Sequence, residues 1–225
     1  MPRRRPALRH DRIIDAAVRV ADRGGLAQVS MRNVGKELNV EAMSLYHHLA
    51  GKDALLDGLA DWFFTQIALP RPDQPWRPAM TDRAASARAA LSKHPWALGL
   101  VESRRSPGPA LLRHHERVLG CLRQHGFPIP LAAHAFSAID SYVYGFVLTE
   151  LNLPFSPGEG AEDFVDQLAE QLPLADYPHL VELITEQVRG REYSYADEFE
   201  FGLNLILDSL EAHLEPADHG VWGRN

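Results

Sequence analysis

Hydrophobic residues recur at intervals of three and four along most of this 225-residue chain, which is the period of an α-helix that buries one face. The first such face holds Ile13, Ala16, Ala17 and Val20. The same pattern predicts helices over residues 31–38, 41–49, 53–69, 79–93, 95–102, 109–125, 131–153 and 194–214, with prolines and Gly126 at several of the breaks between them. No polar–apolar alternation of useful length is present, so the predicted fold class is all-α.

Residues 30–56 predict two short helices joined by a tight turn and followed by a third helix. Ser30 is placed to cap the helix over residues 31–38, because its hydroxyl can accept a backbone N–H of the first turn. Asn39 falls at the turn, and asparagine tolerates the left-handed backbone that a sharp turn requires. Leu45 and Leu49 lie four residues apart and are expected to pack inward. This is the outline of a helix-turn-helix, a DNA-binding unit.

The side chains that this unit turns outward suit contact with DNA. Small residues early in the second helix let its backbone approach base edges, and hydroxyl or imidazole groups farther along can hold phosphates. Lys52 lies at the start of the next helix, where its charge and the helix amides both favour a phosphate. The predicted DNA-contact set is Arg32, Ala42, Met43, Ser44, Tyr46, His48 and Lys52.

Charge is divided unevenly along the chain. Residues 1–60 hold ten Lys and Arg against seven Asp and Glu, whereas the remainder holds 13 against 23, which gives a formal net charge of −7. An N-terminal arm, residues 1–9, carries Arg3, Arg4, Arg5 and Arg9. Basic arms of this kind reach along a DNA groove. A basic front on an acidic chain favours DNA as the partner of the N-terminal part.

Residues 10–60 resemble the N-terminal domain of the TetR family of transcriptional repressors. In that family an amphipathic helix precedes a helix-turn-helix that ends in Leu-Tyr-x-His and is followed by Lys and an acidic residue. The matching positions here are Leu45, Tyr46, His48, Leu49, Lys52 and Asp53. Two positions depart from the family pattern, with Asn39 where glycine is usual and Leu49 where phenylalanine is commoner.

The rest of the chain is long enough for a separate helical core. Its single cysteine, Cys121, cannot form an intramolecular disulfide, which suits a reducing cytoplasm, and we expect it to be a small buried residue. No run approaches the roughly 20 apolar residues of a membrane span. No apolar segment follows the N-terminal arginines as it would in a secretory signal. We therefore expect a cytoplasmic protein without a membrane partner.

The predicted domains are an arm at 1–9, a helix-turn-helix domain at 10–56, a helical ligand-binding and dimerisation domain at 57–215, and a tail at 216–225. The helices over 131–153 and 194–214 carry apolar groups on more than one face. Such helices pack both within their own subunit and against a second copy. The prediction is a homodimer through these two helices, and the alternative is that they are buried wholly inside a monomer.

Residues 91–112, 119–127 and 138–152 are similar to the ligand-sensing domain of the tetracycline-repressor branch of the TetR family. This resemblance implies one small-molecule pocket per subunit, whose occupancy moves the linking helix over residues 53–69. Tetracycline repressors hold their drug as a magnesium chelate that uses histidines and a glutamate. Here the segments TQIALP and VESRRSPG contain no histidine, and Glu150 alone cannot assemble a metal site. Neither tetracycline nor magnesium is therefore carried over, and no metal or cofactor is expected.

Polar residues within apolar helices indicate where an effector binds, because burying a polar group is costly unless it is hydrogen-bonded. The predicted pocket is lined by Trp62, Phe63, Gln66, Trp96, Leu100, Ser137, Asp140, Ser141 and Tyr144. The alternative is that Asp140 pairs with an arginine such as Arg117 or Arg123 and serves only the interface. His114 and His115 are adjacent on a helix, so they point to different sides and are expected at the surface.

These features predict a ligand-responsive transcriptional repressor that binds a palindromic DNA operator as a homodimer and is released by a small-molecule inducer. An enzyme is not predicted, because no nucleophile elbow, phosphate-binding glycine loop, helical histidine pair or paired cysteines occur. The alternative function is a helical protein-interaction module without sequence-specific DNA binding. That alternative leaves the coherent DNA-contact set unexplained.

Overall fold

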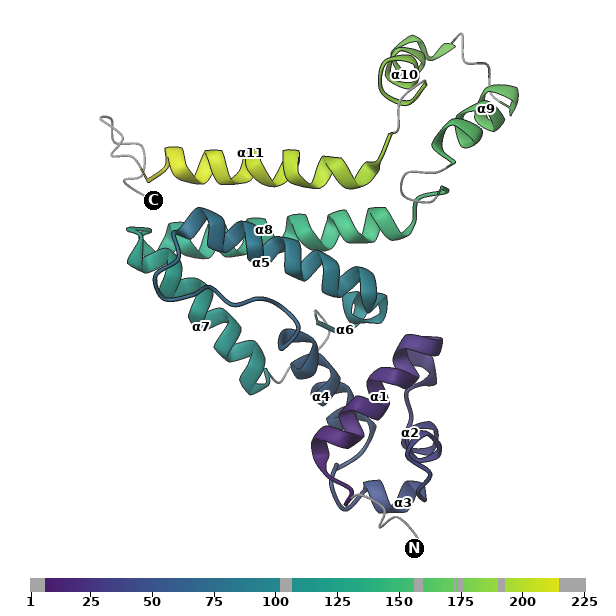
Figure 1. Cartoon of the computed structure of the whole chain (residues 1–225), viewed down its shortest axis with the longest axis vertical. Coiled ribbons are helices and arrows are strands. Elements are labelled where there is room, and N and C mark those ends of the chain that lie inside the picture. Colours follow the sequence, from purple (N-terminus) through teal and green to yellow (C-terminus); the bar gives the residue numbers. More distant parts are fainter. Residues whose placement is uncertain are drawn as a thin grey trace, which may run out of the picture. The chain divides into compact units, whose positions relative to one another are not determined.

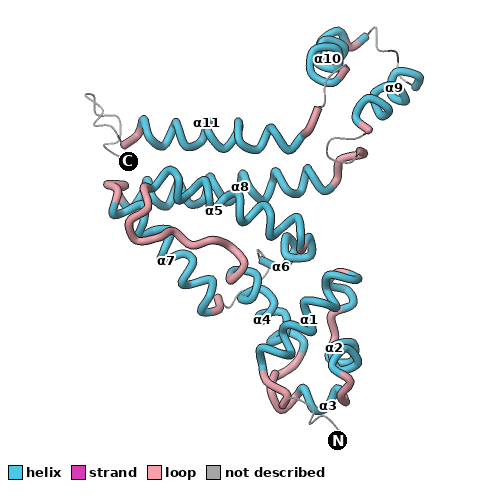
Figure 2. The backbone as a smooth tube through the Cα atoms, viewed as in Figure 1, coloured by secondary structure: helices cyan, strands magenta, loops and turns pink. Residues whose placement is uncertain are grey.

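The computed structural model describes residues 7–101, 107–155, 160–171, 173, 176–189 and 193–214. Among these residues every regular element is helical and no strand occurs, which confirms the all-α prediction (Figure 2). The chain divides into two compact units between Tyr144 and Gly145. The division falls inside one long helix, and each unit is described below by itself.

The first unit begins with a three-helix bundle formed by α1 (His10–Gly24), α2 (Met31–Leu38) and α3 (Ala42–Leu45), with a 3₁₀ turn over Leu26–Gln28 (Figure 1). The predicted face of α1 is buried, and both α2 and α4 (Lys52–Phe64) contact that helix. Leu45 and Leu49 are also buried, as predicted. Burial of these side chains orders a bundle whose helices are too short to be stable alone.

The turn between α2 and α3 is built as the sequence indicates. The Ser30 hydroxyl accepts a hydrogen bond from the backbone N–H of Asn33 at 3.2 Å, which caps α2. Asn39 ends that helix with φ 55° and ψ 48°, in the left-handed region. The prediction that the next helix reaches Leu49 is wrong, because α3 ends at Leu45 and residues 46–48 form turns. The N–H groups of Tyr46 and His48 donate to carbonyls three residues back, which tightens the chain after α3.

The linking helix α4 is shorter than predicted and ends at Phe64, not Leu69. The N–H groups of Thr65 and Gln66 donate to carbonyls three residues back, and the Thr65 hydroxyl donates to the Trp62 carbonyl at 2.6 Å. These bonds satisfy the carbonyls that a longer helix would have used. Beyond the proline-rich loop lie α5 (Trp76–Lys93), a 3₁₀ turn over Pro95–Ala97, α6 (Leu98–Val101), α7 (Pro109–Gln124) and α8 (Ile129–Leu151).

In the first unit α4 contacts α1, α6 and α7, and so connects the three-helix bundle to the helices of the core (Figure 1). Trp76 begins α5 and packs edge-on against Phe127, with ring centroids 5.0 Å apart. Gly126 follows α7 with φ 90°, the helix stop expected of glycine. Cys121 is buried on α7, as predicted, and this burial raises the pKa of its thiol.

The second unit holds the end of α8, followed by α9 (Ala161–Gln171), α10 (Pro178–Leu183), a π-helical turn over Ile184–Val188, a 3₁₀ turn over Tyr195–Asp197, and α11 (Glu198–Ala212). Phe146 stacks on Tyr195 at 4.8 Å and meets Phe199 edge-on at 5.0 Å, which anchors α11 on the end of α8. The sequence pattern did not predict α9 or α10.

Among the described residues, α8 is the one helix with the length and apolar composition of a membrane span, at a mean hydropathy of 1.2. The sequence had predicted no run of this kind. Core helices of globular proteins meet the same criterion, and Asp140 of α8 is ion-paired with Arg83 of α5. Pairing a charged side chain within the fold is typical of a protein core.

Candidate DNA-reading surface and effector core

The predicted DNA-contact residues lie accessible on α2, α3 and the chain that follows. Met43 and Tyr46 are exposed despite their size, with accessible fractions of 71% and 51%. Arg32, His48 and Lys52 are exposed, and the side chains early in α3, Ala42 and Ser44, are half-buried. Large side chains that are exposed to solvent close to one another are typical of a contact surface. All seven side chains are therefore placed where a partner can reach them, and their contact with DNA stays a prediction.

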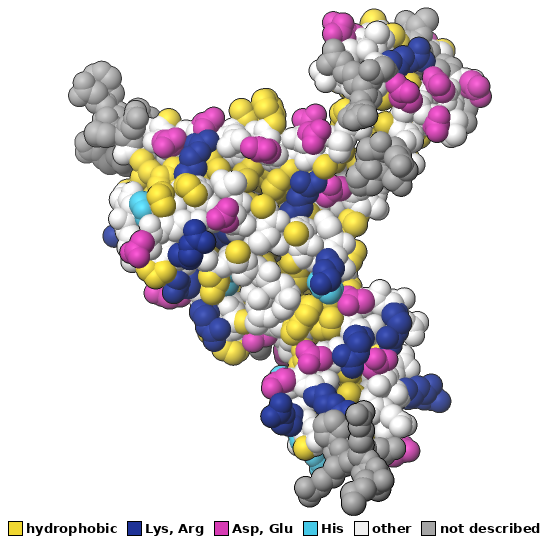
Figure 3. Space-filling model, viewed as in Figure 1, with side chains coloured by type: hydrophobic (Ala, Val, Ile, Leu, Met, Phe, Trp, Pro, Cys, Tyr) yellow, Lys and Arg dark blue, Asp and Glu magenta, His cyan; other side chains and the backbone are white. Residues whose placement is uncertain are grey.

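A surface depression of about 760 Å³ lies beside the turn between α2 and α3. It brings together Arg32, Ala42 and Ser44 of the predicted set with Lys36, Asn39, Val40 and Glu41. Lys36 was missed by the sequence analysis. It stands four residues after Arg32 on α2, a spacing that puts both cations on one helix face and could have identified it. Lys and Arg side chains are visible on the surface of the three-helix bundle (Figure 3).

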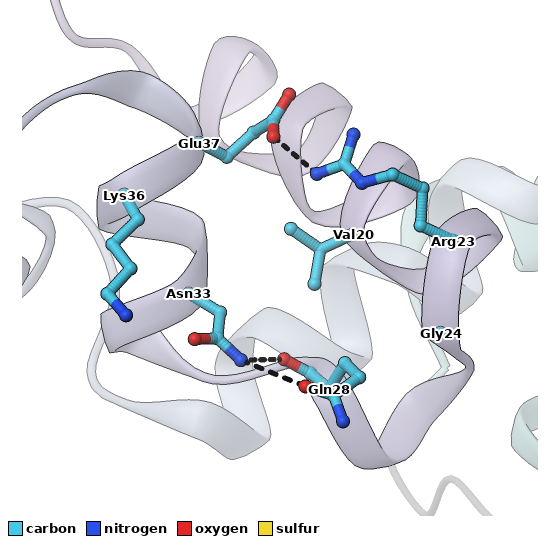
Figure 4. A pocket seen from close by; sticks show the side chains of 7 residues that line it. All are labelled: Val20, Arg23, Gly24, Gln28, Asn33, Lys36 and Glu37. Atoms are coloured by element: carbon cyan, nitrogen blue, oxygen red, sulfur yellow. Dashed lines mark hydrogen bonds and ion pairs between the residues drawn. The ribbon is translucent and has the colours of Figure 1, made fainter.

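Glu37 fixes α2 against α1. Its carboxylate accepts a hydrogen bond from Nε of Arg19 at 2.8 Å and is also paired with Arg23. Hydrogen bonds from Arg19 and then Arg23 hold the pKa of Glu37 below its ordinary value. A pocket of about 410 Å³ lies beside these residues, and Figure 4 shows the side chains that line it. Nδ2 of Asn33, one of the lining residues, donates to the Gln28 backbone oxygen at 2.8 Å. These contacts position α2, which carries two of the cations beside the depression.

Asp22, at the C-terminal end of α1, joins the bundle to the start of the core. Its Oδ1 accepts a hydrogen bond from Nε1 of Trp96 at 2.7 Å and another from Nδ1 of His94, also at 2.7 Å. Trp62 of α4 stacks on Trp96 with centroids 6.2 Å apart and meets His94 edge-on at 5.1 Å. One carboxylate therefore links α1, the turn before α6, and through the aromatic rings α4.

Asp61 forms a second link between α4 and the core. Its Oδ1 accepts the backbone N–H of Ala110 at 2.7 Å and that of Leu111 at 3.2 Å, and so caps the N-terminus of α7. A Cβ on Gly108 would collide with this carboxylate, which explains why glycine precedes α7. A carboxylate at a helix N-terminus is also stabilised by the helix dipole. Movement of α4 would therefore break two hydrogen bonds of α7.

A buried polar cluster lies at the centre of the core, on α5, α7 and α8. Arg83 of α5 donates from Nε to Nε2 of His114 on α7 at 3.1 Å, and it is ion-paired with Asp140 on α8. Its guanidinium lies 5.0 Å from the centroid of the Phe136 ring. The ion pair and the aromatic face together compensate for burying the arginine.

The partner of Asp140 differs from those named in the sequence analysis. Arg117 instead donates to the Pro70 carbonyl at 2.5 Å, and Arg123 donates to the Phe127 carbonyl at 2.6 Å. Each of these arginines therefore bonds a backbone carbonyl outside α7. Asp140 pairs with Arg83 instead. Asp140 therefore belongs to the buried cluster of the first unit.

The prediction that His114 and His115 are surface residues is wrong. His114 is 1% exposed and His115 is half-buried. The buried face of α7 holds Ala110, His114, Val118, Cys121 and Leu122, a helical spacing that includes the first histidine. Burial, and then the charge of Arg83, lower the pKa of His114 to about 3. At neutral pH His114 is therefore an uncharged imidazole.

The predicted effector-binding residues fall into separate groups. Trp62 and Trp96 stack together, and Asp140 lies in the buried cluster. Phe63 and Leu100 are buried, Tyr144 is half-buried, and the exposed members are Gln66, Ser137 and Ser141. Within the described part of the chain, no group of three His, Cys, Asp or Glu side chains could hold a metal ion. Effector contact with the predicted set stays a prediction.

Comparison with known proteins agrees with the helical architecture and the helix-turn-helix. Residues 13–59 match the family described as bacterial regulatory proteins of the tetR family, and residues 69–214 match the tetracyclin repressor-like C-terminal domain. The repressor DrrR1 of Streptomyces coeruleorubidus is 34% identical over 92% of this chain and 78% of its own length. The class C tetracycline repressor of Escherichia coli is 28% identical over 91% of each chain.

Solved structures place the chain among the same proteins. ActR of Streptomyces coelicolor, determined in complex with actinorhodin, superposes with a TM-score of 0.77 at 28% identity, over 94% of this chain and 99% of that one. ActR is described as a TetR family protein, and the resemblance noted in the sequence is thereby confirmed. The chain belongs to the TetR family and is a ligand-responsive transcriptional repressor.

Proposed function

We propose that this repressor binds a two-fold symmetric operator as a homodimer and that a small molecule bound among α4, α5, α7 and α8 releases it from DNA. The observation that carries the DNA-binding part is the exposure of Met43 and Tyr46 beside a depression lined by Arg32 and Lys36. Side chains of α3 would approach base edges in a major groove, while the cations and Tyr46 would meet phosphates.

The homodimer is supported by apolar side chains exposed in the second unit. On α11 Phe201 and Leu205 are 66% and 58% exposed, and on the end of α8 Leu148 and Leu151 are exposed as well. Figure 3 shows hydrophobic side chains on the visible surface of α11 among acidic ones. An apolar surface rimmed by charge is typical of an interface. A two-fold interface through these faces would present two DNA-binding bundles to two half-sites.

Release by an effector is supported by the contacts of α4. This helix caps α7 through Asp61, stacks on Trp96 through Trp62, and places Phe64 5.4 Å from the His114 ring. An effector beside these side chains would favour a different position of α4, and α4 contacts α1 of the bundle. Effector binding and operator binding would then be coupled through one helix. ActR, whose structure was determined in complex with actinorhodin, supports a small-molecule effector.

The test is a salt-titrated binding assay with the full-length protein, using duplex DNA from the region flanking its gene and a scrambled duplex of the same composition. We expect selective binding to the first duplex, and a steep loss of affinity with salt because phosphate contacts release counterions. Tyr46→Ala should weaken binding to both duplexes, because a phosphate contact is independent of the base sequence. Tyr177→Ala removes another exposed tyrosine, outside the bundle, and should leave it unchanged.

The opposite result would favour the alternative, a helical interaction module without sequence-specific DNA binding. Equal affinity for both duplexes, followed by failure to enrich any sequence from a random duplex library, would overturn the operator proposal. Sedimentation equilibrium tests the dimer separately. A monomer at micromolar concentration would overturn the two-fold arrangement while leaving DNA binding to be judged by the duplex assay.

A further inference from the structure

Met43 has the most exposed of the large apolar side chains that the structure describes, with an accessible fraction of 71%. Met31 and Met80, by contrast, are buried. A single exposed apolar residue is common on a protein surface. Met43, however, lies three residues before Tyr46, which is 51% exposed, and four before the exposed His47, so these side chains share one face of the chain. This face is suited to a partner that offers an apolar group.

The backbone that carries Met43 is packed closely on α2. A Cβ on Gly35 would lie 3.0 Å from the carbonyl oxygen of Val40 and 3.3 Å from the backbone nitrogen of Ala42, so glycine is what allows this approach. The N–H of Val40 also donates to the Gly35 carbonyl at 2.9 Å. Leu45 is fully buried at the other end of α3. Met43 is therefore presented by a firmly supported turn of helix, as precise recognition requires.

The groups that border Met43 suit phosphates. Arg32, Lys36 and Ser44 line the depression beside α3, and both cations are exposed. Cations and hydroxyls that hold phosphates set the position of a protein on a duplex, and the side chains between them meet base edges. The charge of this surface therefore favours the major groove of duplex DNA as the partner that Met43 meets.

The chemistry of methionine restricts what it can recognise there. Its side chain has no N–H or O–H group, and its sulfur is a weak hydrogen-bond acceptor. Among the groups that base pairs present in the major groove, the apolar one is the C5-methyl group of thymine. A flexible, polarisable thioether can pack closely around such a group. Ala42, the preceding residue, offers no hydrogen-bonding side chain either.

We propose that Met43 is a specificity-determining residue that reads the C5-methyl group of one thymine in each operator half-site. This inference rests on the proposed function, since it assumes that α3 enters the major groove. It names the feature of the base that this side chain recognises. Because 5-methylcytosine carries its methyl group at the same ring position, methylation of a cytosine placed there should strengthen binding as well.

The first experiment removes single methyl groups from the DNA. A duplex enriched from a random library by the full-length protein is resynthesised with deoxyuridine in place of each symmetric pair of thymines in turn, and affinity is measured by fluorescence anisotropy. We expect one pair at which the change weakens binding about fourfold per half-site, or about sixteenfold for both, as for the loss of one buried methyl group.

Three substitutions assign this effect to Met43. Met43→Ala should bind the thymine and deoxyuridine duplexes with equal affinity, whereas Met43→Leu keeps an apolar side chain of similar size and should keep the preference. Tyr46→Ala is the matched control, because it changes the other large side chain of the same face. It should weaken binding to both duplexes and leave their ratio as it is in the wild type. Circular dichroism would establish that the three variants are folded.

A second comparison places the methyl group on another base. With cytosine or 5-methylcytosine at the sensitive position, the wild-type protein should bind the methylated duplex about fourfold more tightly per half-site. Met43→Ala should bind the two duplexes equally. Equal binding of both by the wild type would contradict the inference.

The inference and the proposed function fail differently. If no thymine of the enriched duplex responds to deoxyuridine, or if Met43→Ala keeps the response, the role of Met43 is overturned while operator binding still stands. If the wild-type protein enriches no sequence, the proposed function is overturned and this inference with it, because a protein that selects no sequence reads no base.

Discussion

Asp22 and Trp96 are joined by a hydrogen bond of 2.7 Å between the indole N–H and the carboxylate, across 74 positions of sequence. Asp22 belongs to the DNA-binding bundle and Trp96 to the core. Since His94 donates to the same oxygen, this carboxylate is a direct polar connection between the two parts that a ligand-responsive repressor has to couple.

Removing the Asp22 carboxylate should destabilise the protein. In Asp22→Ala the buried donors of Trp96 and His94 lose their acceptor, and we expect a decrease of about 1–3 kcal/mol in the free energy of unfolding. Urea denaturation followed by tryptophan fluorescence measures this quantity. Asp15→Ala is the matched control, because Asp15 is exposed on the same helix, and its loss should change stability by less than about 0.5 kcal/mol. Equal effects of the two substitutions would contradict the role given to Asp22.

Loss of the Asp61 cap should act on α7. Asp61→Ala removes the acceptor of two backbone N–H groups at its N-terminus, and a lost cap costs about 0.5–2 kcal/mol. Hydrogen exchange should accelerate first at Ala110 and Leu111. Asp73→Ala, at an exposed loop position, should leave exchange at these amides as it is, and faster exchange there in both variants would count against a specific cap.

Acidification should lower the stability of the protein through the neutral, buried His114. Its pKa is about 3 in the folded protein and 6.5 in the absence of the fold, so between these values the unfolded chain binds a proton that the folded protein does not. The stabilising contribution of the neutral ring is complete above pH 6.5 and is lost as pH falls toward 3, at about 1.4 kcal/mol per pH unit. Urea titrations of wild type and His114→Gln between pH 4 and 8 test this. A constant difference between the two proteins over that range would refute it.

Lys36 should contribute to DNA binding although it was not in the predicted set. Lys36→Ala and Lys52→Ala should each weaken binding to all duplexes alike and reduce the magnitude of the slope of log affinity against log salt by about 1. Lys93→Ala, at an exposed position at the end of α5, should leave the slope unchanged. If the Lys36 variant behaves like the Lys93 variant, the depression beside α2 is not a phosphate-binding surface.

Charge placed on the exposed face of α11 should separate the subunits. Phe201→Asp and Leu205→Asp put a carboxylate where an apolar contact is expected, and desolvating an unpaired charge is costly. We expect monomers in sedimentation equilibrium and loss of operator binding, with helix content by circular dichroism preserved. Glu200→Asp, at an exposed neighbouring position, serves as the control.

Local signals in the sequence predicted the DNA-binding part well. Ser30 and Asn39 act within a few residues of themselves, so the cap of α2 and the left-handed turn follow directly from residue type. The predicted C-terminal ends of α3 and α4 were wrong, because an apolar periodicity can continue through residues that form turns. The Tyr46 and Thr65 amides show this, since each bonds to a carbonyl three residues back.

The centre of the core could not be predicted, for a different reason. Arg83 and Asp140 are 57 residues apart, and nothing in either neighbourhood indicates the other. The sequence around His114 predicts a surface residue, because the arginine that bonds its ring in the core comes from another helix. The helices α9 and α10 were not predicted, because their apolar patterns are too short to be distinguished from a loop.

The buried Arg83 joins three helices of the core. Its guanidinium bonds His114 of α7, pairs with Asp140 of α8 and lies over the Phe136 ring. A change at any one of these positions should therefore alter the packing of α5, α7 and α8 together. The cluster should therefore tolerate substitution as a set and not one position at a time.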